Sequence, residues 1–242
     1  MNVDVRHKSL QDADAALVVV GLYEGDSLPA EVSGAPGAGD AKGSFKAMTR
    51  LYPGGPERLL VVGLGERESF DVEKLRVLAA LVAGEAAKVE ATSLAWALPA
   101  YEDEAAAAEA IVTGTILGSY RFTKFKGDTK EDDDKPGLES LTVLAGEELA
   151  GAVETARVYS EAANRARDLQ ETPANFNRPE DLAARAEEIA ASNDTVTVDI
   201  LDGAAIIAKG MGGSRRRRGS RPRPCRRSRR SPRPAWPDPR GG

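Results

Sequence analysis

The chain has 242 residues, of which 41% are hydrophobic and 5% aromatic, enough for one large domain or two small ones with aliphatic cores. Its formal net charge of −5 combines +11 in residues 214–242, which hold twelve arginines and one aspartate, with −16 in residues 1–213. The apolar run 15–23 is far shorter than the roughly 18 residues of a membrane span, and charged side chains in residues 1–12 exclude a secretory signal. We therefore expect a soluble cytoplasmic protein that makes no contact with membranes.

Residues 1–147 alternate short apolar runs with helical patterns. Asp71 is expected to cap a helix that Gly84 ends, and the alanine-rich residues 102–120 predict a second helix. Apolar runs that read as buried strands lie at residues 15–22, 58–64, 91–98 and 138–144. Alternation of this kind predicts a parallel or mostly parallel sheet covered by helices, so we assign 1–147 to a first α/β domain.

Residues 148–213 predict a linker followed by the start of another α/β domain. Residues 147–169 form a long helical pattern that is well placed to join two domains. Pro179 suits the first position of a further helix, and the β-branched residues 196–201 predict a strand. The pattern then stops near residue 213, so this second domain is expected to be truncated.

Two glycine patterns fall short of phosphate-binding loops. Residues 63–65 read Gly-Leu-Gly after a strand, but Glu68 stands where a dinucleotide-binding loop needs a third glycine. Residues 34–39 have the outer glycine spacing of a P-loop, but Asp40 and Ala41 replace the lysine and hydroxyl residue that contact phosphate and metal. We interpret both segments as turns or surface loops.

The residue types needed for metal binding or nucleophilic catalysis are scarce. His7 is the only histidine and Cys225 the only cysteine, so neither an internal disulfide nor a zinc site of the common Cys/His kinds can be assembled. The acidic run 131–134 lacks the spaced ligands and glycine of a calcium loop, which favours a solvated loop. The sequence supports no Ser/His/Asp set, and we assign no catalytic, cofactor-binding or metal-ligating residue.

One segment is specific enough to indicate a family. Residues 164–175 resemble the leucyl aminopeptidase pattern Asn-x-Ala-Arg-Asp-Leu-x-Asn-Thr-Pro-Ala-Asn, with Glu171 where asparagine is usual. Residues 114–122 are similar to the Gly-x-x-x-Gly-x-Tyr-Arg-Phe stretch of the same family. Residues 62–65 and 179–183 also fit its pattern in the right order.

The resemblance implies a three-layer N-terminal domain similar to macro domains, joined by a helix to a catalytic domain. It also implies hexamers and removal of N-terminal residues from peptides by two divalent cations, zinc or manganese, which lower the pKa of a bridging water. The family motifs that bear the metal ligands and the catalytic lysine, Gly-Lys-Gly-x-Thr-Phe-Asp-Ser-Gly-Gly and Asn-Thr-Asp-Ala-Glu-Gly-Arg, do not occur here. We therefore expect no bound cofactor and no catalysis by this chain alone.

Residues 214–242 have a composition unlike the rest. They hold six prolines and twelve arginines, which predicts a disordered tail. We interpret the tail as a frameshift, because GCG alanine codons read one base late become CGG arginine codons. The competing hypothesis is a flexible arm that binds nucleic acid non-specifically through its phosphates. For the chain as a whole, two alternative functions remain open. It could be a non-catalytic macro-like binding module, or it could assemble with a full-length homologue.

Overall fold

The computed structural model describes residues 1–125 and 136–211. The chain divides into two units, the first Met1–Pro173 and the second beginning at Ala174. The acidic run 131–134 and the tail 214–242 lie outside the described residues. Within the described ranges, no helix is long and apolar enough to cross a membrane.

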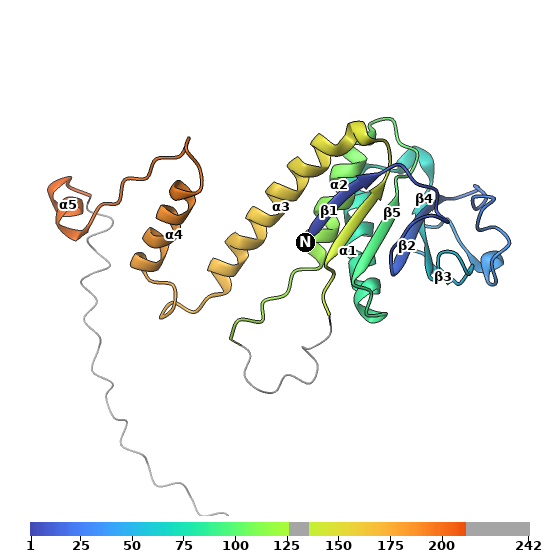
Figure 1. Ribbon diagram of the computed structural model, residues 1–242, viewed down its shortest axis with the longest axis horizontal. Helices are drawn as coiled ribbons and strands as arrows, with labels where there is room; N and C mark the ends of the chain where they lie inside the picture. The colour runs from blue at the N-terminus through green and yellow to red at the C-terminus, as the bar shows by residue number, and fades with distance from the viewer. Residues whose placement is uncertain (126–135, 212–242) are drawn as a thin grey trace, which may run out of the picture. The chain divides into compact units, whose positions relative to one another are not determined.

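The first unit is built on one six-stranded sheet with the strand order β1-β6-β5-β2-β4-β3 (Figure 1). The strands are β1 Asn2–Arg6, β2 Leu17–Tyr23, β3 Met48–Leu51, β4 Leu59–Gly65, β5 Ser93–Ala97 and β6 Ser140–Leu144. Neighbouring strands run parallel except for β3, which pairs antiparallel with β4. The mostly parallel sheet expected from the sequence is therefore confirmed.

Three helices cover one face of this sheet: α1 Val72–Lys88, α2 Glu104–Gly118 and α3 Ala150–Glu171 (Figure 1). Because side chains alternate along a strand, Val19 and Val62 pack under the helices while Val18 and Val61 point to the opposite face. That second face is covered by loop side chains, among them Leu10. The separate loop between β2 and β3 contains a short 3-10 helix, Ala38–Asp40. The first unit thus has three layers, and one of them consists of loops.

Side-chain caps fix where the helices begin. Asp71 Oδ1 accepts a hydrogen bond of 2.7 Å from the amide of Lys74, as the sequence predicts for the start of α1. The predicted end at Gly84 is wrong, since α1 continues to Lys88. Gly84 has no neighbour within 4 Å of an added Cβ and takes no left-handed conformation, so it stays an ordinary helical residue.

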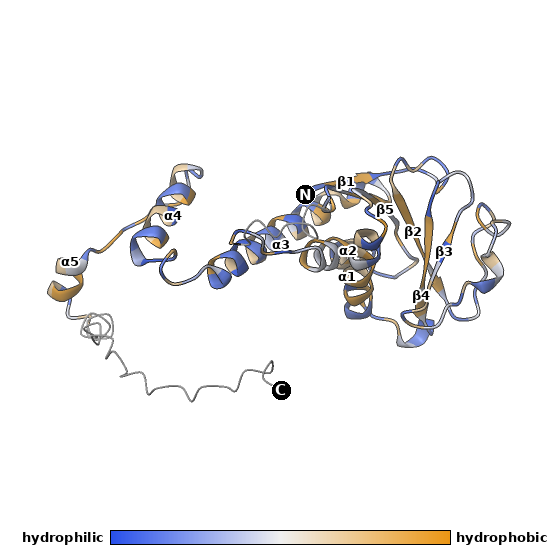
Figure 2. Cartoon of the chain, turned by 90° about the horizontal axis from the view of Figure 1, so that it is seen from below, coloured by the Kyte–Doolittle hydropathy of each residue, from blue (hydrophilic) through white to orange (hydrophobic). Residues whose placement is uncertain are grey.

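The second unit contains the helices α4 Pro179–Ala191 and α5 Gly203–Ala208. The predicted helix start at Pro179 is confirmed, and Arg178 donates its amide hydrogen to Asp181 Oδ2 over 2.9 Å. The strand expected at 196–201 is not formed, because no strand among the described residues pairs with this segment. Figure 2 shows hydrophobic residues beside hydrophilic ones on α4, whereas α5 is mostly hydrophobic.

Candidate functional site at the junction of three helices

The two segments that carry the family resemblance meet at the carboxyl end of α2. The last carbonyls of a helix have no partner within the helix. Asn164 of α3 donates a hydrogen bond from Nδ2 to the Ile116 carbonyl over 3.1 Å, and Arg167 donates from Nη1 to the Leu117 carbonyl over 3.2 Å. The positive charge of the Arg167 guanidinium is also attracted to the negative, carboxyl end of the α2 dipole. Side chains of α3 therefore cap α2.

A second contact joins the turn after α2 to α3. The Tyr120 hydroxyl donates a hydrogen bond of 2.9 Å to Asp168 Oδ1, and the Arg167 guanidinium lies 5.5 Å from the Tyr120 ring centre. Desolvation raises the pKa of Tyr120 above its ordinary value, and the hydrogen bond to Asp168 is the second largest cause of this rise. Arg167 and Asp168, neighbours in the sequence, thus each bind a different partner on the α2 side.

The Gly-x-x-x-Gly spacing lets α2 approach α1 closely. A Cβ on Gly114 would lie 2.2 Å from the Arg76 carbonyl oxygen and 2.6 Å from Ala79 Cβ. A Cβ on Gly118 would lie 2.6 Å from Ala80 Cα. None of these three distances is tolerable for a side chain, so the two glycines set the spacing of α1 and α2.

The face of α3 that meets the first unit changes character along its length. Val153, Ala156 and Ser160 are buried, and at the same helical spacing Asn164 and Arg167 are partly buried. Apolar packing therefore holds the first half of α3, and hydrogen bonds to α2 hold the second half. The junction fixes the helix almost to its end at Glu171, where Thr172 Oγ1 donates to the Asp168 carbonyl over 2.6 Å.

Two hollows adjoin this junction. One has a volume of about 450 Å³ and is bordered by Met1, Tyr120, Glu161 and Asp168, among others. The other, of about 280 Å³, is bordered by Asp168 and Thr172, among others. The Met1 ammonium lies 3.8 Å from Glu161 Oε1, so the start of β1 is tied to α3 as well. The polar groups that border the first hollow thus bind one another, Tyr120 with Asp168 and Met1 with Glu161, and these contacts hold α3 in position.

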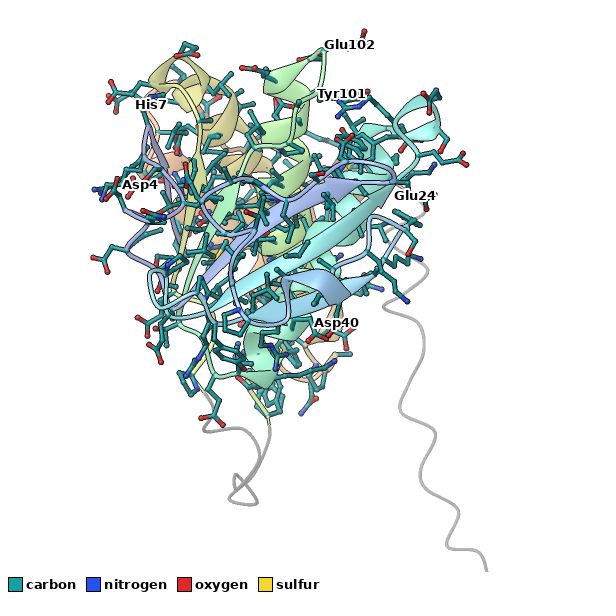
Figure 3. The ribbon with its side chains drawn as sticks, turned by 90° about the vertical axis from the view of Figure 1, so that its right-hand side faces the viewer. Asp4, His7, Glu24, Asp40, Tyr101 and Glu102 are labelled. Atoms are coloured by element: carbon teal, nitrogen blue, oxygen red, sulfur yellow. The ribbon has the colours of Figure 1, made fainter. Side chains whose placement is uncertain are left out.

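The donor set does not fit the two-metal centre that the resemblance implies. Among residues 1–125 and 136–211, no three His, Cys, Asp or Glu side chains gather where they could hold a metal ion. His7 is exposed, and Figure 3 shows it well separated from Glu24, Asp40 and Glu102.

The glycines at residues 63–65 serve backbone packing. A Cβ on Gly63 would lie 2.0 Å from the Ser44 carbonyl oxygen. The Gly63 amide donates to the Ala47 carbonyl over 2.8 Å, and the Gly65 amide donates to the Gly43 carbonyl over the same distance. The loop 43–47 therefore runs along the carboxyl end of β4, and the glycines allow that approach.

The pairing of Tyr120 with Asp168 is a feature that the sequence does not reveal. The two residues are 48 positions apart, and each lies in a separate segment that resembles the family. The signal that could have linked them is the presence of both segments in one chain. No residue spacing indicates that the second segment caps the first.

Sequence comparisons point to one family. A family model described as the N-terminal domain of the cytosol aminopeptidase family matches residues 19–129. A probable cytosol aminopeptidase of Roseiflexus castenholzii is 33% identical over 206 residues, covering 81% of this chain and 42% of the relative. A probable cytosol aminopeptidase of Thermosynechococcus vestitus is 38% identical over 173 residues, covering 71% of this chain and 35% of the relative.

Solved structures share the fold. A mutant of tomato leucine aminopeptidase matches with a TM-score of 0.69 at 24% identity, covering 86% of this chain and 46% of that one. The bottromycin maturation enzyme BotP matches with a TM-score of 0.68 at 24% identity, covering 82% of this chain and 42% of that one. The chain thus spans less than half the length of these similar proteins.

Proposed function

Because the N-terminal part of the chain belongs to the cytosol aminopeptidase family, we propose that Met1–Pro173 is the N-terminal domain and linker helix of a two-metal, leucyl-type aminopeptidase. Residues 174–213 are then the beginning of its catalytic domain. In the whole enzyme, this domain supports the removal of N-terminal residues from peptides. The names of the relatives support a cytoplasmic location, which we propose as well.

The helix junction carries this proposal. Asn164, Arg167 and Asp168 hold α3 against the end of α2 through three hydrogen bonds. Domains joined by a helix keep a fixed geometry only if the helix itself is held. The function that the junction supports is therefore to set the direction in which the chain leaves the first unit towards the catalytic domain.

We propose further that the chain by itself does not hydrolyse peptides. The carboxylates and the lysine of the family's catalytic motifs are missing from the sequence. Zinc or manganese, bound in the whole enzyme, would activate water there. Assembly of this chain with intact homologues, including a hexamer, is a secondary proposal that rests only on the resemblance.

A hybrid enzyme tests the function directly. Met1–Pro173 would replace the equivalent part of the Roseiflexus castenholzii relative, and turnover of leucine p-nitroanilide with added manganese would be compared with that of the unchanged relative. We expect turnover within about tenfold of the parent, since the catalytic residues are untouched. A hybrid that folds as the parent does but shows no turnover would refute the proposal.

For residues 214–242 we propose a shifted reading frame. The arginine-rich composition begins directly after Gly212-Gly213, and alanine codons read one base late supply such a run. The coding DNA is the test. One of the two alternative frames beyond codon 213 should encode the missing catalytic motifs. If neither frame does so, the frameshift is wrong, and the nucleic-acid-binding arm becomes the better account of the tail.

A further inference from the structure

The second unit has amphipathic segments but no core among its described residues. Within 174–211, no residue is buried. Helix α4 presents an apolar stripe of Leu182, Ala186 and Ile189, which lie on one face at helical spacing. Residues 195–200 alternate threonine or aspartate with Val196, Val198 and Ile200, the pattern of a strand with one apolar face, and Leu201 follows them.

The exposed apolar surface of this unit is large for its length. Seven large apolar side chains are between 41% and 53% exposed: Leu182, Ile189, Val196, Val198, Ile200, Ile207 and Met211. Exposed large apolar side chains in this number mark an interaction site or a risk of aggregation. Residues 212–242 contain a single large apolar side chain, Trp236, so their composition offers little apolar cover.

We propose that the apolar stripe of α4 and the segment 195–201 form a docking surface for the C-terminal part of a cytosol aminopeptidase, even when that part is supplied as a separate polypeptide. In the complex, segment 195–201 adds as a strand to an open sheet edge of the partner. The α4 stripe covers the same sheet. The identity of this partner rests on the proposed function.

The lengths of the relatives favour this occupant. The match to the Roseiflexus castenholzii relative covers 81% of the chain, more than Met1–Pro173 alone could supply, so it reaches into the second unit. More than half of the relative lies outside the match, and the matched family model is an N-terminal domain. The polypeptide that follows the match is therefore the natural cover for the exposed surface.

The chemistry of the surface fits such a partner. An unpaired strand has main-chain donors and acceptors that a sheet edge can satisfy, while alternate side chains fill pockets on the partner's face. On α4, Glu180 and Glu187 lie on the side away from the stripe, so their charges stay in solvent after docking. The segments then order as they bind.

Co-expression tests the proposal. The affinity-tagged full chain would be produced together with the part of the Roseiflexus castenholzii relative that follows the match. We expect the untagged part to be retained on the tagged chain. We also expect slower hydrogen exchange in residues 174–211 of the complex than in the chain alone.

Matched variants make the test specific. A chain with Leu182→Asp and Ile189→Asp should lose affinity for the partner by at least about tenfold, because charges would be buried in an apolar contact. Ala184→Asp puts the same charge on the opposite face of α4 and should leave retention unchanged. Equal retention by all three chains, or none by the unaltered chain, would overturn the proposal.

A second copy of the chain is the competing occupant. If the chain alone forms a dimer that the Leu182→Asp and Ile189→Asp changes dissociate, the surface serves self-association and the proposal is wrong. Failure of the proposed function is seen separately, since the hybrid enzyme contains only Met1–Pro173 and reports activity. Retention of the partner reports docking whether or not peptides are cleaved.

Discussion

The hydroxyl of Tyr120 and the carboxylate of Asp168, 48 residues apart in the chain, are joined by a hydrogen bond of 2.9 Å. This contact links the turn after α2 to the last turns of α3. In addition, Asn164 and Arg167 donate hydrogen bonds to the last carbonyls of α2. The segments that resemble the aminopeptidase family thus have a shared structural purpose, which is to hold the linker helix.

Removing the caps should weaken the first unit. Asn164→Ala combined with Arg167→Ala leaves the Ile116 and Leu117 carbonyls without these donors, and we expect a loss of about 1–3 kcal/mol in the free energy of unfolding. Urea unfolding followed by circular dichroism measures the change. Arg165→Ala, on the exposed side of α3, is the control and should change stability little. Equal effects of the two would argue against the capping role.

Two glycine substitutions should have opposite effects. Gly114→Ala forces α1 and α2 apart and should destabilise the unit by about 1–3 kcal/mol. Gly84→Ala lies in α1 with open space around it and should stabilise the helix by up to about 1 kcal/mol. Thermal melts of both variants check the prediction. A Gly114→Ala protein as stable as the unaltered chain would mean that the helices are not in close contact.

Stability should fall in alkaline solution. Burial raises the pKa of Tyr23, and desolvation with the Asp168 hydrogen bond raises that of Tyr120, both from an ordinary value of 10.0. The folded state therefore keeps these protons at pH values where the unfolded chain has lost them. The corresponding stability is complete below pH 10.0 and is lost as the pH rises through the raised values.

Tyr23→Phe tests the alkaline effect. Urea midpoints measured from about pH 8 to about pH 11 should decline less steeply in this variant than in the unaltered chain. The phenolic hydroxyl also donates to the Ala100 carbonyl over 2.9 Å, so the variant should be somewhat less stable at neutral pH. Parallel declines in the two proteins would show that Tyr23 does not contribute to the pH dependence.

The arginine-rich residues should govern any binding to nucleic acid. With six or more phosphate contacts, affinity for duplex DNA should drop about a thousandfold or more between about 50 mM and about 200 mM salt. Fluorescence anisotropy with a labelled duplex measures this slope. Deletion of residues 214–242 should abolish binding, because the remaining residues 1–213 carry a net charge of −16. Binding that survives the deletion would place the interaction elsewhere.

Local signals predicted much of the first unit. The Asp71 cap and the apolar runs of β2, β4, β5 and β6 depend on neighbouring residues, and each was found close to its expected position. The short strands β1 and β3 were not predicted. In β1 only Val3 and Val5 pack inward between exposed residues, a weak pattern, and β3 has only four residues.

The errors come from features that depend on distant partners. Gly84 could have ended α1, but a glycine ends a helix only if it turns left-handed, and here it does not. Segment 196–201 has a strand pattern without a partner among the described residues. The contacts of Asn164, Arg167 and Asp168 join positions about 50 apart, and no sequence periodicity carries that information.

The most direct test of the account is peptidase activity of the purified chain. Leucine p-nitroanilide would be incubated with residues 1–242 and added manganese or zinc, next to the hybrid that carries Met1–Pro173 on the catalytic part of the relative. We predict turnover by the hybrid and none above buffer by the chain. Turnover that co-elutes with the chain through successive columns would contradict the account.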